Sequence, residues 1–186
     1  ETDPGQAGGQ AVAEVLFGDY NPAGKLPLTF YRNLAQIPDF EDSNMTGRTY
    51  RYMKETPLFP FGHGLSYTTF KYGKLKMNDD KIAAGQNLNL VIPVTNTGSR
   101  DGDEVVQVYL KKMDDTEGPV KTLRAFKRVR IPAGKTVEVK FSLNDTQLEW
   151  WDEQSNTMRV CPGNYTVMIG GTSCEKSLLS RTFTIR

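Results

Sequence analysis

The sequence has little of the chemistry that a self-contained metal or nucleophilic active site needs. Its 186 residues include one histidine, His63, and two cysteines, whereas a zinc site needs several such ligands close together. A Ser-His-Asp triad would have to use His63, yet no Gly-x-Ser-x-Gly elbow occurs. We therefore predict no metal site, and we interpret His63 as a hydrogen-bonded loop residue.

An excess of one charge and long apolar runs are also missing. The 23 basic and 22 acidic residues leave a formal charge of +1, so no field would concentrate nucleic acid or an anionic membrane. No apolar run approaches the roughly 18 residues of a membrane span, and the first ten residues are polar and glycine-rich rather than signal-like. We expect neither a nucleic acid nor a membrane as partner, and an uncharged partner instead.

The two cysteines, Cys161 and Cys174, are predicted to be free thiols. Tyr165, Val167 and Ile169 alternate like a strand between them. Even about five extended residues, at roughly 3.3 Å each, separate the ends far beyond the roughly 7 Å that a disulfide allows between Cα atoms.

The length of the chain allows one domain of common size plus a remnant of another. Residues 7–17 carry apolar side chains at helical spacing, and Gly18 supplies a helix stop. Residues 25–31 are predicted to form a short extended segment interrupted by Pro27. A lone helix and strand cannot bury both faces, and the chain then stays irregular up to residue 66, so we predict a tail or linker that needs a partner to lie against.

After Tyr67 the pattern changes to period two, which is typical of half-buried strands. Leu88, Leu90, Ile92 and Val94 point one way, and residues 137–143 repeat the arrangement. Turns rich in Gly, Pro, Asn and Asp separate these segments. We therefore predict that residues 67–186 form a mainly β, two-sheet sandwich of the immunoglobulin or fibronectin type III kind, with strands at 70–77, 88–94, 104–111, 123–131, 137–143, 150–160 (bent at 155–156), 165–170 and 178–185.

Three acidic pairs are candidates for catalytic groups, because retaining sugar hydrolysis uses two carboxyl groups about 5 Å apart. The pairs are Asp79-Asp80, Asp114-Asp115 and Asp152-Glu153. Each lies in or beside a predicted polar turn, where solvent keeps a carboxylate ordinary. We interpret all three as solvated turn residues and predict no catalytic residue in this chain.

Two further clusters also favour a structural interpretation. Asp101, Asp103 and Glu104 lack the twelve-position pattern of a calcium loop, so a turn entering a strand is favoured. The glycines of residues 5–9 precede a helix, as in a phosphate cradle, but the Lys and Ser/Thr of a P-loop are missing.

Trp150 and Trp151 are the candidates for ligand binding. Because adjacent strand residues face opposite ways, one ring should face the core and the other solvent. An exposed tryptophan can stack on a sugar ring, and it can equally lie at a domain interface. Both interpretations remain open, with the interface favoured.

Several strings carry a resemblance to glycoside hydrolase family 3, the family of β-glucosidases and β-xylosidases. They occur in one order and cover essentially the whole chain. They are Pro-Gly-Gln-Ala-Gly-Gly at 4–9, Leu-Phe-Gly-Asp-Tyr-Asn-Pro-Ala-Gly-Lys-Leu-Pro at 16–27, Arg-Thr-Tyr-Arg-Tyr at 48–52, Pro-Leu-Phe-Pro-Phe-Gly-His-Gly-Leu-Ser-Tyr at 57–67, Asn-Thr-Gly at 96–98 with Asp-Gly-Asp-Glu-Val-Val-Gln-Val-Tyr at 101–109, and Pro-Gly-Asn-Tyr at 162–165.

The resemblance implies that this chain is the carboxy-terminal portion of such an enzyme. Members have a barrel with the nucleophilic Asp, an α/β sandwich with the acid/base, and then a fibronectin type III-like domain. Both catalytic carboxylates lie upstream of the Pro-Gly-Gln block, so neither corresponds to a position here. By the same resemblance, residues 1–31 are the end of the α/β sandwich domain, residues 32–66 the interdomain linker and residues 67–186 the fibronectin type III-like domain. The chain's partners would then be the upstream catalytic domains of the same polypeptide and the oligosaccharide substrate of the parent enzyme.

The parent enzyme implied is an exo-acting β-glycosidase that removes terminal β-D-xylosyl or β-D-glucosyl residues by retaining double displacement, with water as second substrate and no cofactor. The Arg-Thr-Tyr-Arg-Tyr string resembles the β-xylosidase branch, because β-glucosidases more often show Gly-Tyr-Arg-Tyr. The resemblance also implies a periplasmic or extracellular location. Two alternatives are a carbohydrate-binding β-sandwich that uses Trp150 or Trp151 and a free-standing protein-interaction domain.

Overall fold

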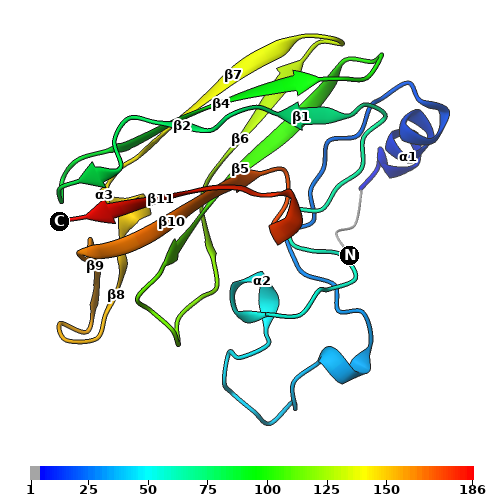
Figure 1. Cartoon of the computed structure of the whole chain (residues 1–186). Coiled ribbons are helices and arrows are strands. Elements are labelled where there is room, and N and C mark those ends of the chain that lie inside the picture. Colours follow the sequence, from blue (N-terminus) through cyan, green and yellow to red (C-terminus); the bar gives the residue numbers. More distant parts are fainter. Residues whose placement is uncertain (1–4) are drawn as a thin grey trace.

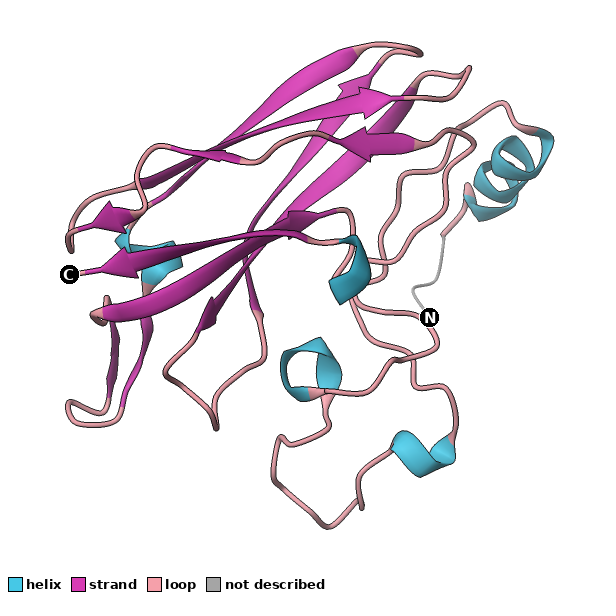
Figure 2. Cartoon of the chain, in the orientation of Figure 1, coloured by secondary structure: helices cyan, strands magenta, loops and turns pink. Residues whose placement is uncertain are grey.

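The computed structural model describes residues 5–186, so Pro4 of the Pro-Gly-Gln block lies outside the described part. Two layers of strands form one side of the molecule, and the loops and short helices that precede residue 70 cover the other side (Figures 1 and 2). The two-sheet sandwich expected from the period-two pattern is confirmed.

One sheet is built around β4 (Leu88–Asn96), which pairs antiparallel with β7 (Thr136–Leu143). Its other edge pairs with β1 (Phe70–Tyr72) and then with β2 (Lys76–Met77). The single strand expected at 70–77 is therefore divided in two. The break faces Pro93, which has no N–H for the ladder, and a Cβ added to Gly73 would lie 2.6 Å from Pro93 Cγ.

The other sheet has the order β3-β11-β10-β5-β6. Neighbours pair antiparallel except for β3, a two-residue edge parallel to β11 that the sequence did not predict. The bounds are β3 Lys81–Ile82, β5 Gly102–Lys112, β6 Thr122–Ile131, β10 Gly163–Gly170 and β11 Leu179–Ile185.

The core lies between the two sheets. Leu88, Leu90, Ile92 and Val94 of β4 are fully buried while the residues between them are more exposed, as predicted. They belong to one cluster with inward-facing residues of β5, β7, β10 and β11. Each buried side chain of this size contributes about 1.5–3 kcal/mol relative to leaving it exposed, so this layer supplies the main stabilisation of the fold.

The segment after β7 differs from the prediction of one bent strand. α3 (Asp145–Leu148) comes first, closed by a capping box between Asn144 and Gln147. A hairpin of β8 (Trp150–Asp152) and β9 (Thr157–Arg159) follows. The bend expected at 155–156 is part of its turn, in which Asn156 has φ +52°, a conformation that asparagine tolerates.

Before residue 70, α1 (Gly8–Phe17) ends at Gly18 with φ +81°, as predicted. The strand expected at 25–31 does not form; a single bridge joins Phe30 to Phe59. The linker expected to be irregular contains η1 (Leu34–Gln36) and α2 (Thr49–Tyr52), and a further turn, η2 (Glu175–Ser177), precedes β11.

The linker lies against the sandwich through α2. The Tyr50 ring stacks on Phe61 at 4.3 Å and meets the buried Tyr109 edge-on at 5.8 Å. Its hydroxyl accepts from the backbone N–H of Leu123 at 3.2 Å. Thr49 reaches this position with φ +54°, a left-handed conformation that costs an L-residue roughly 1–2 kcal/mol.

A nearly buried carboxylate makes a second contact between the sandwich and the residues before it. Glu104 of β5, whose side chain is 7% exposed, pairs with Lys25 at 3.4 Å and accepts from the Tyr72 hydroxyl at 2.9 Å. Burial raises the pKa of Glu104, and Lys25 and Tyr72 oppose that rise. This contact therefore ties the first segment to both sheets.

We predict that Thr49→Gly is more stable than Thr49→Ala by about 0.5–1 kcal/mol. Both variants lose the hydroxyl that accepts from the Arg51 N–H, but alanine keeps the Cβ that opposes positive φ, and glycine's larger unfolded-state entropy offsets part of the gain. Urea unfolding followed by far-ultraviolet circular dichroism measures the difference. Equal midpoints would show that Thr49 stores no strain.

We also predict a pH signature for Glu104. The pKa of Glu104 is higher in the folded than in the unfolded chain, so protonation of Glu104 favours folding. This contribution to the free energy of unfolding is fully present below the ordinary pKa of 4.5 and is lost as the pH rises through the folded-state pKa. The stability of the wild type relative to Glu104→Gln should fall as the pH is raised from about 4.5 to about 8. Urea midpoints across this range measure it, with exposed Glu138→Gln as control; a rising difference would contradict the sign.

Candidate functional site

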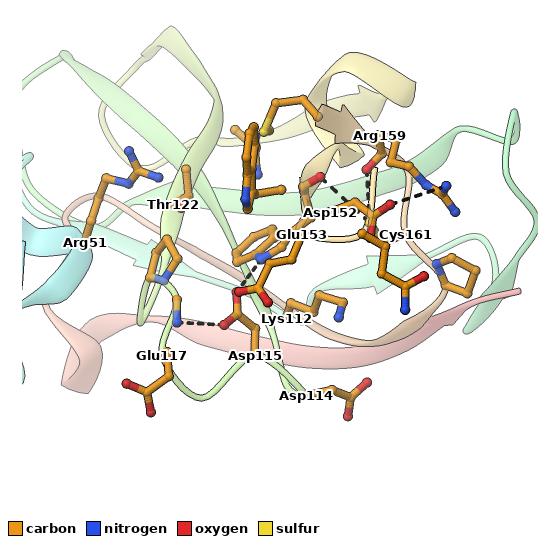
Figure 3. Close-up of a pocket in the computed structure, with 18 of the residues that line it drawn as sticks. Arg51, Lys112, Asp114, Asp115, Glu117, Thr122, Asp152, Glu153, Arg159 and Cys161 are labelled. Atoms are coloured by element: carbon orange, nitrogen blue, oxygen red, sulfur yellow. Dashed lines mark hydrogen bonds and ion pairs between the residues drawn. The ribbon is translucent and has the colours of Figure 1, made fainter. Parts of the chain in front are cut away.

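A cleft of about 640 Å³ lies where three segments that are distant in sequence meet. The linker contributes Arg51 and Tyr52, the β5–β6 loop contributes residues 114–119, and the β8–β9 hairpin contributes the third wall. In Figure 3, Arg51 and Thr122 lie on one side, Asp152 and Arg159 on the other, and Asp115 and Glu153 between them. Sequence reasoning named several of these residues but did not place them together.

The two tryptophans face opposite ways, as predicted. Trp150 is 3% exposed, whereas Trp151 is 51% exposed. The Trp150 ring meets Tyr165 of the core edge-on at 6.2 Å. Because alternate strand residues take opposite faces, the burial of Trp150 directs Trp151 outward, and both rings line the cleft.

Asp115 holds Trp150 and the β5–β6 loop together at the cleft. It accepts from the Trp150 indole N–H at 2.6 Å and from the backbone N–H of Gly118 at 2.7 Å. A half-buried carboxylate with two donors differs from the solvated turn residue that the sequence suggested. Asp115 thereby joins the β5–β6 loop to the hairpin.

Arg124 lies over the Trp150 ring. Its guanidinium carbon is 5.3 Å from the centre of the Trp150 ring, a cation–π geometry, and its Nη2 donates to the Glu149 carbonyl at 2.6 Å. Burial, with Arg51 nearby, lowers the pKa of Arg124. Within residues 5–186, the buried Nε of Arg124 and Oγ1 of Thr122 have no hydrogen-bond partner.

The cleft brings two of the three acidic pairs together, Asp114-Asp115 and Asp152-Glu153. Asp152 accepts from the Ser155 hydroxyl at 2.6 Å and pairs with Arg159 at 3.4 Å. The Ser155 hydroxyl holds the pKa of Asp152 below its usual value, the opposite of what a general acid needs. The partners of Asp115 and Asp152 thus give both carboxylates structural roles.

The third acidic pair and the cluster of Asp101, Asp103 and Glu104 have separate surroundings. Asp79 accepts from the Lys81 N–H at 3.0 Å, near β3. Asp101 accepts from the Ala133 N–H at 2.9 Å, which lowers its pKa. Asp103 pairs with Arg128 at 2.7 Å, and Glu104 pairs with Lys25. In residues 5–186 no group of three or more His, Cys, Asp or Glu side chains could hold a metal ion.

The remaining sequence candidates also lie outside the cleft or have no ligand-binding geometry. His63 lies in a loop and stacks on Phe59 at 5.0 Å. Cys161 is buried at the cleft wall and Cys174 is partly exposed, and both are free, as predicted. None of the helices that the structure describes is long and apolar enough to span a membrane.

Comparison with known proteins gives consistent matches along the chain. A model described as the glycosyl hydrolase family 3 C-terminal domain matches residues 2–67, and a fibronectin type III-like domain matches residues 104–173. A xylan 1,4-beta-xylosidase from Xylanibacter ruminicola is 51% identical over 98% of this chain and 21% of its own length. A periplasmic beta-glucosidase from Salmonella typhimurium is 38% identical over 92% of this chain and 24% of its own.

A solved structure agrees with these matches. The β-glucosidase of Bifidobacterium adolescentis superposes with a TM-score of 0.83 at 30% identity, over 97% of this chain and 28% of that one. The chain therefore spans about a fifth to a quarter of the length of such proteins, and the resemblance noted in the sequence is confirmed.

We predict that Asp115→Ala destabilises the chain by about 1–3 kcal/mol, because the Trp150 indole N–H and the Gly118 amide would lose their acceptor. The midpoint of urea unfolding measures the loss. Glu117→Ala, an exposed carboxylate of the same loop, should stay within about 0.5 kcal/mol of the wild type. A neutral Asp115→Ala would show that the loop does not depend on this residue.

Proposed function

The chain belongs to glycoside hydrolase family 3, whose members it matches in their carboxy-terminal region, and we propose that it supports the catalytic domains of an exo-acting β-glycosidase. In this proposal the upstream part of the same polypeptide carries the catalytic carboxylates. The chain itself is an accessory module that packs against them. Residues 1–31 would complete the preceding α/β domain, residues 32–66 would connect, and residues 67–186 would form the sandwich.

The observation that carries this proposal is the distribution of exposed apolar side chains. Among residues 5–186, most large apolar side chains that are exposed lie before Thr68. On α1, Leu16 and Phe17 are 72% and 84% exposed, and Phe40 of the linker is fully exposed. Exposed apolar side chains in such number are typical of a segment that packs against a partner. The relatives are about four times as long as this chain, so upstream polypeptide is its proposed occupant.

The contacts in the cleft support a catalytic site elsewhere. Retaining hydrolysis requires a free nucleophile and a carboxyl group whose pKa is raised. Asp115 is committed to Trp150 and Gly118, and Asp152 to Ser155 and Arg159. We therefore propose that none of the described residues acts as a catalytic carboxyl group.

We propose that the parent enzyme favours β-xylosides over β-glucosides. The 51% identical relative is named a xylan 1,4-beta-xylosidase, and the Arg-Thr-Tyr-Arg-Tyr string resembles the β-xylosidase branch. A periplasmic or extracellular location is proposed on the family resemblance, and the name of the Salmonella relative is in line with it. Fractionation of the source cells would test the location.

We predict that the purified 186-residue chain hydrolyses neither aryl β-xylosides nor aryl β-glucosides above the buffer blank. In this proposal none of the described residues supplies the paired carboxyl groups that stabilise an oxocarbenium-like transition state. The polypeptide encoded by the whole reading frame should hydrolyse the aryl β-xyloside faster than the aryl β-glucoside. The assay measures release of the aryl alcohol.

The matched control for contamination is the chain with Asp152→Asn and Glu153→Gln. A rate above the blank that disappears in this variant would place catalysis in the cleft and refute the accessory role. A whole polypeptide that prefers the β-glucoside would refute the proposed specificity alone.

A further inference from the structure

We propose that the cleft between the linker, the β5–β6 loop and the β8–β9 hairpin binds a neutral oligosaccharide, with Trp151 as its stacking platform. This site goes beyond the supporting role proposed above. It needs neither a catalytic group nor the upstream domains, so its test is independent of theirs.

The platform is a half-exposed aromatic side chain next to a buried and well-anchored one. The Trp151 ring is 51% exposed, and its neighbour Trp150 is fixed by Asp115, Tyr165 and Arg124. Met158, 45% exposed, lies directly across the hairpin from Trp151 and lines the same cleft. Cross-strand partners share one face, so Trp151 and Met158 form a continuous apolar ledge. The C–H face of a pyranose ring is an apolar surface of comparable shape that such a ledge can cover.

The lining offers the hydrogen-bonding groups that sugar hydroxyls need. A hydroxyl both donates and accepts, and the cleft carries acceptors such as Glu153 beside donors such as Lys112 and Arg51. The buried Thr122 Oγ1 and Arg124 Nε have no partner among the described residues. Both atoms have almost no accessible surface, so the direct hydrogen bonds to a sugar would come from the more exposed charged side chains of the lining.

The charge and size of the cleft determine the class of ligand. Residues of both signs line it, in nearly equal number: Arg51, Lys112, Arg124 and Arg159 are basic, and Asp114, Asp115, Glu117, Asp152 and Glu153 are acidic. Such a mixture gives no net preference for an anion or a cation. Its volume of about 640 Å³ lies within the range of about 300–1,000 Å³ typical of small-molecule sites. A few units of an uncharged sugar chain fit both constraints.

A domain interface is the competing explanation for an exposed tryptophan, and the lining disfavours it. The cores of protein interfaces are depleted of charged residues, whereas this cleft is rich in them. The exposed apolar residues that suit an interface lie before Thr68 instead. The two surfaces therefore differ in chemistry as well as in position.

The experiment is titration of the 186-residue chain with xylohexaose, followed by tryptophan fluorescence and by calorimetry. We expect saturable binding, weakened at least tenfold by Trp151→Ala and several-fold by Glu153→Ala, which removes an exposed hydrogen-bond acceptor of the lining. Phe126→Ala is the matched control, because Phe126 is an aromatic residue, 68% exposed, on β6 outside the cleft. Cellohexaose in place of xylohexaose reports the sugar that the site prefers within the neutral class.

Three outcomes would overturn the proposal: no saturation by either sugar, equal binding by wild type and Trp151→Ala, or tighter binding of an acidic hexamer of galacturonate than of both neutral sugars. Circular dichroism and urea unfolding of each variant show whether it is folded. Should Trp151→Ala not fold, Trp151→Thr, which removes the aromatic ring and suits a strand, and Glu153→Ala decide, because retained binding by both would equally overturn it.

Discussion

The sandwich depends on one constraint, namely that the strands of each sheet bury one face against the opposite sheet, most regularly as alternate side chains in β4 and β7. In β4 the constraint produces a row of fully buried aliphatic residues from Leu88 to Val94. In the short β8 it acts through a single residue, because burial of Trp150 leaves Trp151 on the outer face. A one-residue change of register would exchange these two rings. The outward platform is thus a consequence of core packing.

Several residues of the strings that resemble the family make contacts that hold segments of the sandwich together or attach the linker to it. Gln107 of β5 is buried, donates to the Gly171 carbonyl at 2.6 Å and accepts from the Tyr109 hydroxyl. Gly62 approaches Gln107 so closely that a Cβ would overlap its amide, and it has φ +78°, which glycine adopts at low cost. Asn96, also buried, donates to the carbonyls of Arg100 and Ile131 at 2.7 and 2.9 Å. These residues satisfy buried polar groups at places where segments meet, which requires specific side chains rather than any hydrophobic residue.

Sequence reasoning succeeded where one periodic segment determines its own structure. The long strands and α1 followed from periodicity, and the free thiols followed from the strand between them. It failed for α2, because four residues have no periodicity and their position depends on Tyr50 contacting Phe61 and Tyr109. The Asn144 to Gln147 capping box was a readable signal for α3. The cleft could not be predicted, because its three walls are joined by tertiary contacts such as that of Asp115 with Trp150.

The position of α2 links the two roles proposed for the chain. Arg51 and Tyr52 form a wall of the cleft, while Tyr50 beside them attaches the linker to the sandwich. The Arg51 carbonyl also accepts from the Val120 N–H of the β5–β6 loop at 2.7 Å, so the linker contacts a second wall directly. A shift of the linker would therefore change the shape of the cleft. A ligand that favours one position of the linker is, by thermodynamic linkage, bound more tightly when the upstream domains hold the linker in that position. Ligand binding in the cleft and packing against the upstream domains would therefore be coupled through α2.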